Sequence, residues 1–155
     1  MLPLLEIEIP FNPNLIDAGG FVLAWHGLFS FVGVATAVWL VARWARQERL
    51  DPDMVYNTAI WAILGGIVGA RVVHVADNWG SVYGFHDPIQ LVAVWSGGIG
   101  LWGAILGGWI AGMIYAYISK YPVGKLMDLS APALLVAQSI GRLGDIMNGE
   151  HWSKN

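Results

Sequence analysis

An uncharged run of twenty residues, IGLWGAILGGWIAGMIYAYI, occupies positions 99–118. A helix rises about 1.5 Å per residue, so about 20 apolar residues are enough to cross the hydrocarbon core of a bilayer. The whole chain has the same character: 56% of its 155 residues are hydrophobic and 12% are charged. That charged share is about half of what soluble domains carry. The run therefore predicts a transmembrane helix in an integral membrane protein.

Three further apolar segments are long enough to span a membrane, with predicted limits of about 21–42, 56–76 and 126–147. The start of the second is marked by Asp51, a typical N-cap residue, and by Pro52, which is favoured in the first helical turn. We therefore predict an all-α integral membrane protein of about four transmembrane helices, forming one membrane domain over residues 1–155.

The basic residues predict the orientation of this domain. The N-terminal arm and the segment 77–98 contain no lysine or arginine, whereas the connections after the first and third spans are basic. By the positive-inside rule these two basic loops are cytoplasmic, and the N-terminus and the segment 77–98 lie outside. Within that segment the apolar stretch 88–95 predicts a short helix on the outer surface. The basic loop residues are Arg43, Arg46, Arg49, Lys120 and Lys125.

Glycines four residues apart mark two of the spans. Because lipid provides little hydrophobic drive between helices, such small residues allow the close backbone contact that holds membrane helices together. Two interpretations remain open: packing of span 56–76 against span 99–118, or docking of either span against another membrane subunit. The pairs are Gly65 with Gly69, Gly103 with Gly107, and Gly108 with Gly112.

A polar cluster, GRLGDIMNGE, ends the last span at residues 141–150. Charges near hydrocarbon cost several kcal/mol unless they are paired or hydrated, so such a cluster predicts a site. Arg142 and Asp145 lie three residues apart and hence on one helix face. They predict either a buried ion pair that holds the span in place or a cation that binds a lipid phosphate.

Other polar residues have two interpretations each. Arg71 could bind a lipid phosphate or extend to the outer interface and pair with Asp77. We expect His26 to be a hydrogen-bonded packing residue, with a catalytic base as the alternative. The four histidines lack the spacing of a metal site, so we expect no metal ligands. The net charge of −3 argues against nucleic acid as a partner, and the absence of cysteine excludes thiol chemistry on this chain.

Five segments resemble a known family in order and spacing: WHGL at 25–28, GGIVGAR at 65–71, VWSGG at 94–98, DLSAP at 128–132 and the signature that begins at Gly141. The chain is similar to the N-terminal half of the prolipoprotein diacylglyceryl transferase family. The resemblance implies transfer of a diacylglyceryl group from phosphatidylglycerol to the cysteine thiol of a lipoprotein precursor. It further implies a multi-pass protein of the bacterial plasma membrane that acts at the outer leaflet without metal or organic cofactor.

The resemblance also assigns site residues. Arg142 and Arg71 stand where the family has arginines, which suit phosphate because the guanidinium binds its oxygens bidentately. The supporting signature positions are Gly141, Gly144, Asp145, Asn148 and Glu150.

Four positions depart from the family pattern. The family usually has tyrosine at His26, histidine at Trp102, asparagine at Asp145 and glycine at Ser153. Tryptophan has no lone pair that accepts a proton, so Trp102 cannot replace a histidine base. The chain also ends at Asn155, before the second half of the family. We therefore expect a non-catalytic scaffold or lipid-binding subunit of a membrane complex. The alternative is an active transferase whose site is completed by a longer chain or a second polypeptide.

Overall fold

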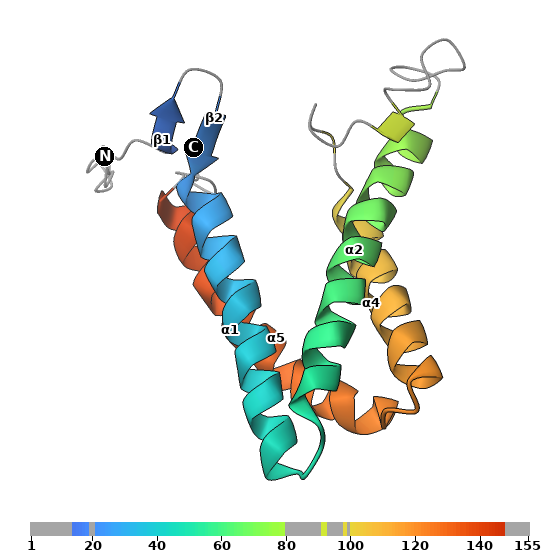
Figure 1. Cartoon of the computed structure of the whole chain (residues 1–155). Helices are drawn as coiled ribbons and strands as arrows, with labels where there is room; N and C mark the ends of the chain where they lie inside the picture. Colours follow the sequence, from blue (N-terminus) through green and yellow to red (C-terminus); the bar gives the residue numbers. More distant parts are fainter. Residues whose placement is uncertain (1–13, 19–20, 80–90, 93–97, 99, 148–155) are drawn as a thin grey trace, which may run out of the picture. The chain divides into compact units, whose positions relative to one another are not determined.

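The computed structural model describes residues 14–18, 21–79, 91–92, 98 and 100–147. Four helices dominate these residues, and a two-stranded sheet precedes the first of them (Figure 1). The elements in chain order are β1 (Asn14–Ala18), β2 (Phe21–Ala24), α1 (Trp25–Gln47), α2 (Pro52–Asp77), α4 (Leu101–Ile118) and α5 (Val123–Met147).

The fold class predicted from the sequence is confirmed. Helices α1, α2 and α4 are each long and apolar enough to cross a membrane. Helix α5 has 25 residues but is less apolar and does not join that set, so a fourth span remains a prediction. Of the predicted surface helix at 88–95, Leu91 and Val92 are helical, and the other residues lie outside the described part of the chain.

The first predicted span begins too early. Residues 21–24 were expected to be helical, but they form β2, which pairs antiparallel with β1 in the register Ala18 to Phe21. The register shifts between Asn14 and Ile16. The physical reason is local: two apolar runs flank the dipeptide Gly19-Gly20, a sequence typical of two-residue hairpin connections. The helix starts only at Trp25.

The chain divides into two compact units. Unit 1 comprises Met1–Val41 and Leu129–Asn155, and therefore contains the hairpin, most of α1 and most of α5. Unit 2 comprises Ala42–Asp128 and contains α2, α4 and the turns on either side of them.

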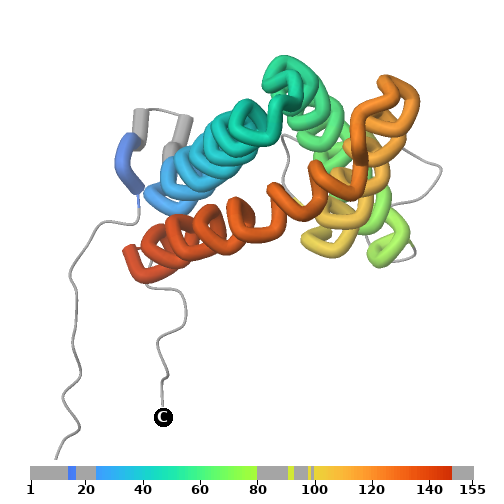
Figure 2. The backbone as a smooth tube through the Cα atoms, turned by 90° about the horizontal axis from the view of Figure 1, so that it is seen from below, coloured from blue at the N-terminus to red at the C-terminus, as the bar shows by residue number. Residues whose placement is uncertain are grey.

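Unit 2 is built on glycine contacts between α2 and α4, which lie side by side (Figure 2). A Cβ added at Gly65 would come within 2.7 Å of the carbonyl oxygen of Gly107, and one at Gly108 would lie 3.0 Å from that of Ala62. Side chains at these positions would force the helices apart. The prediction that the two glycine-bearing spans pack on each other is confirmed.

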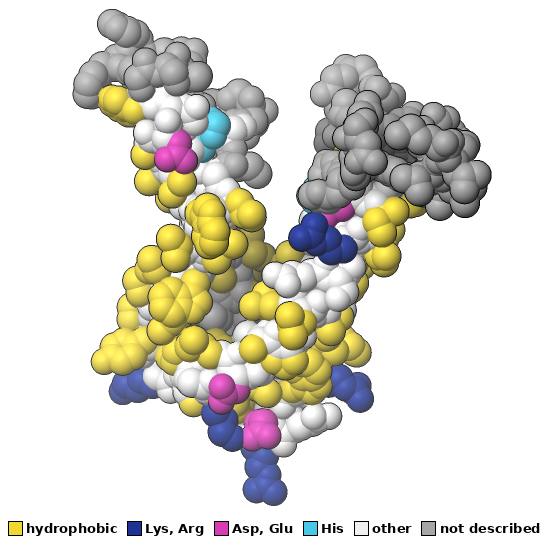
Figure 3. Space-filling model, turned by 180° about the vertical axis from the view of Figure 1, so that it is seen from behind, with side chains coloured by type: hydrophobic (Ala, Val, Ile, Leu, Met, Phe, Trp, Pro, Cys, Tyr) yellow, Lys and Arg dark blue, Asp and Glu magenta, His cyan; other side chains and the backbone are white. Residues whose placement is uncertain are grey.

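The two basic loops meet at one end of unit 2. Asp51 caps α2 by accepting a hydrogen bond from the Asp53 amide at 2.9 Å, as the sequence predicted. Its own carbonyl accepts a hydrogen bond from the Tyr121 hydroxyl at 3.1 Å, and Lys125 pairs with Glu48 at 2.5 Å. Lysine and arginine side chains gather at this end, and hydrophobic side chains cover the middle of the helices (Figure 3). Which side of the membrane this end faces remains a prediction.

Titration at this basic end follows from these contacts. The hydrogen bond from Lys125, together with its charge, lowers the pKa of Glu48 below its ordinary value. Burial raises the pKa of Tyr121, and the negative charge of Asp51 raises it further. The basic end is thus a hydrogen-bonded junction between the turn after α1 and the turn before α5.

Candidate functional site

The site of unit 1 forms where the last turns of α5 meet the first turns of α1. Asp145 lies at its centre. The Arg142 Nη1 donates to one carboxylate oxygen at 3.3 Å, and the His26 Nδ1 lies 2.7 Å from the other oxygen. One carboxylate therefore joins a guanidinium to an imidazole.

Exposure differs sharply within this cluster. The Asp145 side chain is 14% exposed, whereas His26 is 47% exposed and Arg142 is 71% exposed. The ion pair that the sequence predicted between Arg142 and Asp145 is present. The expectation that the pair is buried is wrong for its cation, because Arg142 projects from the α5 surface while the carboxylate is turned toward α1.

The contact of His26 with Asp145 was not foreseen. Nothing close to His26 in the sequence positions it for proton transfer, whereas Asp145 is a group that can do so. The two residues lie at opposite ends of the described chain, so no local spacing relates them. The available signal was indirect: the resemblance drawn from the sequence implies a different residue at both positions, and the structure places these two residues in direct contact.

Gly144 explains how the two helices come close enough for this contact. A Cβ at Gly144 would lie 3.0 Å from the His26 Cα and 2.9 Å from the Phe29 Cβ. Further along the same helix pair, a Cβ at Gly33 would lie 2.8 Å from the carbonyl oxygen of Ala137. By contrast, a Cβ at Gly141 would meet nothing within 4 Å among the described atoms. Of the two signature glycines, Gly144 is therefore the one that packs against α1.

Arg71 lies in unit 2 and is 5% exposed. Its Nε donates to the carbonyl oxygen of Leu91 at 3.1 Å, and its Nη1 donates to that of Gly98 at 3.0 Å. Gly98 has a φ of 76°, a conformation that favours glycine. The guanidinium thus connects Leu91 and Gly98, which precede α4 in the chain, to α2. This structural role was neither of the two interpretations drawn from the sequence.

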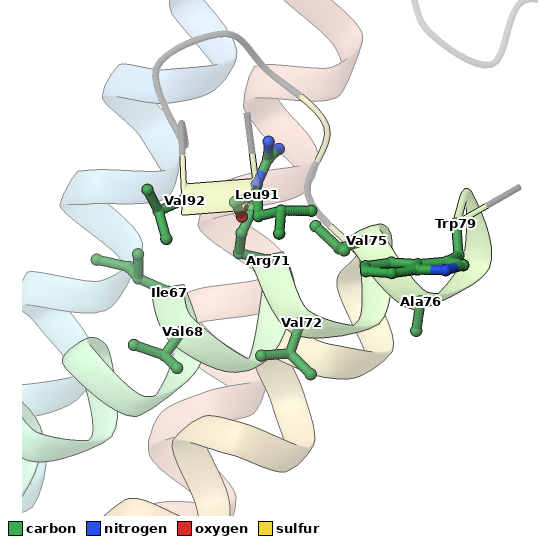
Figure 4. A pocket seen from close by; sticks show the side chains of 9 residues that line it. All are labelled: Ile67, Val68, Arg71, Val72, Val75, Ala76, Trp79, Leu91 and Val92. Carbon is green, nitrogen blue, oxygen red and sulfur yellow. Dashed lines mark hydrogen bonds between the residues drawn. The ribbon is translucent and has the colours of Figure 1, made fainter. Parts of the chain in front are cut away.

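An apolar cavity of about 430 Å³ runs along the outside of α2 in the same unit. In Figure 4 the guanidinium of Arg71 points away from Val68 and Val72 and toward the segment that carries Leu91. The cavity wall is aliphatic and aromatic, which suits hydrocarbon. It is lined by Ile67, Val68, Arg71, Val72, Val75, Ala76, Trp79, Leu91 and Val92.

The remaining predicted site residues are placed as follows. Trp102 lies in the first turn of α4 and is 73% exposed. Asn148, Glu150 and Ser153 lie outside the described residues. Within the described part of the chain, no three His, Cys, Asp or Glu side chains gather in a way that could hold a metal ion.

Comparison with known proteins gives one family. The model of the family described as prolipoprotein diacylglyceryl transferase matches residues 13–155. The phosphatidylglycerol–prolipoprotein diacylglyceryl transferase of Thermosynechococcus vestitus is 38% identical to this chain over 87% of the chain and 50% of its own length. That of Trichormus variabilis is 35% identical over 99% of this chain and 54% of its own length. The enzyme of Limosilactobacillus reuteri is 36% identical over 93% of this chain and 52% of its own length. The chain spans about half the length of these curated relatives.

Proposed function

Because this chain belongs to the prolipoprotein diacylglyceryl transferase family, we propose that it supplies the phospholipid-binding part of a diacylglyceryl transferase in a bacterial plasma membrane. Phosphatidylglycerol, named in the relatives' activity, is the proposed lipid partner. The observation that carries the proposal is the exposed guanidinium of Arg142, which is held at the end of α5 by Asp145.

The chemistry of arginine supports this assignment. A guanidinium has five N–H donors in a fixed fork that fits two oxygens of a phosphodiester. One of these donors contacts Asp145 through a 3.3 Å hydrogen bond. The 71% exposure of the side chain leaves the group accessible to a headgroup. Arg71 is buried and bonded to backbone carbonyls, so we assign it a role in the fold of unit 2.

Asp145 contacts both Arg142 and His26, so the net charge of this cluster depends on the protonation of His26. With neutral His26 the cluster of Arg142, Asp145 and His26 has no net charge, and with protonated His26 it has a net charge of +1. The negative charge of Asp145 is divided between two partners, of which His26 is the nearer at 2.7 Å.

A lipid-binding scaffold without catalysis is the second candidate. It is favoured by Trp102, which carries no proton acceptor and is 73% exposed at the start of α4. The glycine faces of α2 and α4 lend no support to a partner subunit, because they pack on each other. The two candidates share phospholipid binding and differ in whether lipid is transferred.

Both parts of the proposal can be measured on the full-length protein in nanodiscs. Retention of phosphatidylglycerol is followed by native mass spectrometry, and transfer is followed as thioether formation on a synthetic prolipoprotein peptide with one cysteine. We expect R142Q to weaken phosphatidylglycerol binding by roughly 10- to 100-fold, the equivalent of one or two charge-assisted hydrogen bonds. The matched control is R46Q, which removes the same charge from the basic end. Equal binding by R142Q and the unmodified protein would refute the assignment.

A further inference from the structure

We propose that His26, positioned by Asp145, is the general base of this site and accepts the proton of the attacking thiol. The inference rests on the proposed function and adds a residue role to it. It starts from the contact between the His26 Nδ1 and the Asp145 carboxylate at 2.7 Å. The two side chains come from different helices, His26 from α1 and Asp145 from α5, so the contact depends on how these helices pack.

The carboxylate fixes the tautomer of the imidazole. An ionised carboxylate only accepts hydrogen bonds, so the proton between the two groups belongs to the His26 Nδ1. A neutral imidazole with its proton on Nδ1 has its lone pair on Nε2. The ring is therefore oriented with a proton acceptor on the edge away from Asp145, which is the arrangement of a histidine base with a carboxylate behind it.

The His26 imidazole lies partly at the surface of unit 1, where a substrate can reach it. Nearly half of the His26 side chain is exposed, at 47%, although Nδ1 faces Asp145. Gly144 lies against the His26 backbone and keeps α5 close without covering the ring with a side chain. A nucleophile can thus approach the imidazole from outside the helix pair.

The cation lies next to the base. Arg142 contacts the second oxygen of the same carboxylate, so guanidinium and imidazole are separated by a single carboxylate group. A phosphodiester on Arg142 is then held beside the proton acceptor. A base and an oxyanion-stabilising cation at neighbouring positions are the two groups that displacement at a phosphate ester carbon requires.

The thiol proton passes to the His26 Nε2 as the sulfur attacks the glycerol carbon that carries the phosphate ester oxygen. An S–C bond forms and the C–O bond breaks, and its electron pair leaves with glycerol phosphate, whose added charge is stabilised by Arg142. The proton on His26 then passes to the departing phosphate, and the neutral imidazole is restored. No oxidant, reductant or metal takes part.

The test measures thioether formation on the one-cysteine peptide by the full-length protein in phosphatidylglycerol nanodiscs. We expect H26Q to lower kcat by about 100-fold or more, with a much smaller change in KM for phosphatidylglycerol. D145N keeps the shape of the carboxylate but accepts more weakly, and should also lower kcat; because Asp145 also contacts Arg142, this variant should in addition raise KM for phosphatidylglycerol. Added imidazole should partly restore turnover to H26A. S139A on α5 and T36A on α1 are the matched controls, because both hydroxyls bond to carbonyls of their own helices.

The outcomes separate this inference from the function on which it rests. Normal turnover by H26Q, in a protein that binds lipid and transfers it, would overturn the role of His26 and leave the proposed function standing. Phosphatidylglycerol binding without any transfer by the unmodified protein would overturn both the base and the transferase, in favour of the scaffold. Loss of kcat in H26Q that imidazole does not restore in H26A would also count against a base. Helical content by circular dichroism verifies that each variant is folded.

Discussion

Both helix pairs of this protein pack through glycines, but the arginine of one pair is buried and that of the other is exposed. In unit 2, α2 and α4 meet through glycines on both helices, and Arg71 is 5% exposed and bonded to the carbonyls of Leu91 and Gly98. In unit 1, α1 and α5 meet at Gly33 and Gly144, and Arg142 is 71% exposed beside a shared carboxylate. The difference shows that the residue type alone does not define a site. We assign a role in the fold to the arginine whose guanidinium is bonded to backbone carbonyls, and we propose a role in chemistry for the one that projects beside a histidine.

The largest effect is expected from a methyl group placed in the α2–α4 contact. A Cβ at Gly107 would lie 2.9 Å from the Gly69 Cα and against the backbone of Gly65, where nothing can rotate away. We expect G107A to lower the free energy of unfolding by about 3 kcal/mol. G144A should cost less, because its Cβ would lie 2.9 Å from the Phe29 Cβ and 3.0 Å from the His26 Cα, whereas a Cβ at Gly107 would overlap the carbonyl oxygen of Gly65.

The matched control for this series is G124A in the first turn of α5. A Cβ there would meet nothing within 4 Å in the part of the chain that the structure describes. The change from glycine to alanine in a helix is then expected to stabilise by up to about 1 kcal/mol. Reversible unfolding in mixed micelles, followed by circular dichroism, gives all three values. A stability of G107A equal to that of G124A would show that the helices do not pack as described.

The second prediction tests the contrast between the arginines directly. R71M removes the two hydrogen bonds to the carbonyls of Leu91 and Gly98, and we expect a loss of about 2 kcal/mol in unfolding free energy. R142M should change stability by less than about 0.5 kcal/mol, because exposed ion pairs contribute little. Phosphatidylglycerol binding should show the reverse order, with the larger loss in R142M. If both variants lose stability equally, the distinction between a structural and a site arginine is wrong.

Local and periodic features of this fold were accessible from the sequence. The apolar runs predicted the helices, and Asp51 with Pro52 predicted the start of α2. The four-residue glycine spacing predicted close packing, because a repeat along one helix face constrains its neighbour. The contact of Arg142 with Asp145 also followed from local geometry, since residues three apart share a helix face.

The contacts that decide the site were not accessible in the same way. The partner of His26 comes from the far end of the chain, and only the packing of α5 on α1 brings Asp145 to it. Two partners of Arg71 are backbone carbonyls, which every residue has, so no side-chain pattern predicts them. The hairpin before α1 had a signal in Gly19-Gly20, but the apolar character of 21–24 continues into the helix and concealed the boundary.

The smallest predicted effect concerns the basic end of unit 2, where the polar contacts are structural. The Tyr121 hydroxyl donates to the Asp51 carbonyl at 3.1 Å, and Y121F should cost about 1 kcal/mol of unfolding free energy at neutral pH. The raised pKa of Tyr121 in the folded protein adds a dependence on pH. Its contribution is fully present below the tyrosine pKa of the unfolded chain, at about 10, and is lost as pH rises through the folded pKa.

The measurement is the unfolding free energy of the unmodified protein and of Y121F between pH 8 and pH 11.5. The difference between the two proteins should be constant up to about pH 10 and shrink above it, because only the unmodified protein has a Tyr121 hydroxyl to ionise. Y117F is the control, since Tyr117 is exposed on α4. A difference that grows with pH would mean that ionised Tyr121 is favoured by the fold, which burial beside Asp51 forbids. The basic end of unit 2 would then stabilise a charged side chain, as Asp145 does for Arg142 in unit 1. The contrast between structural polar contacts in unit 2 and a charged site in unit 1 would no longer hold.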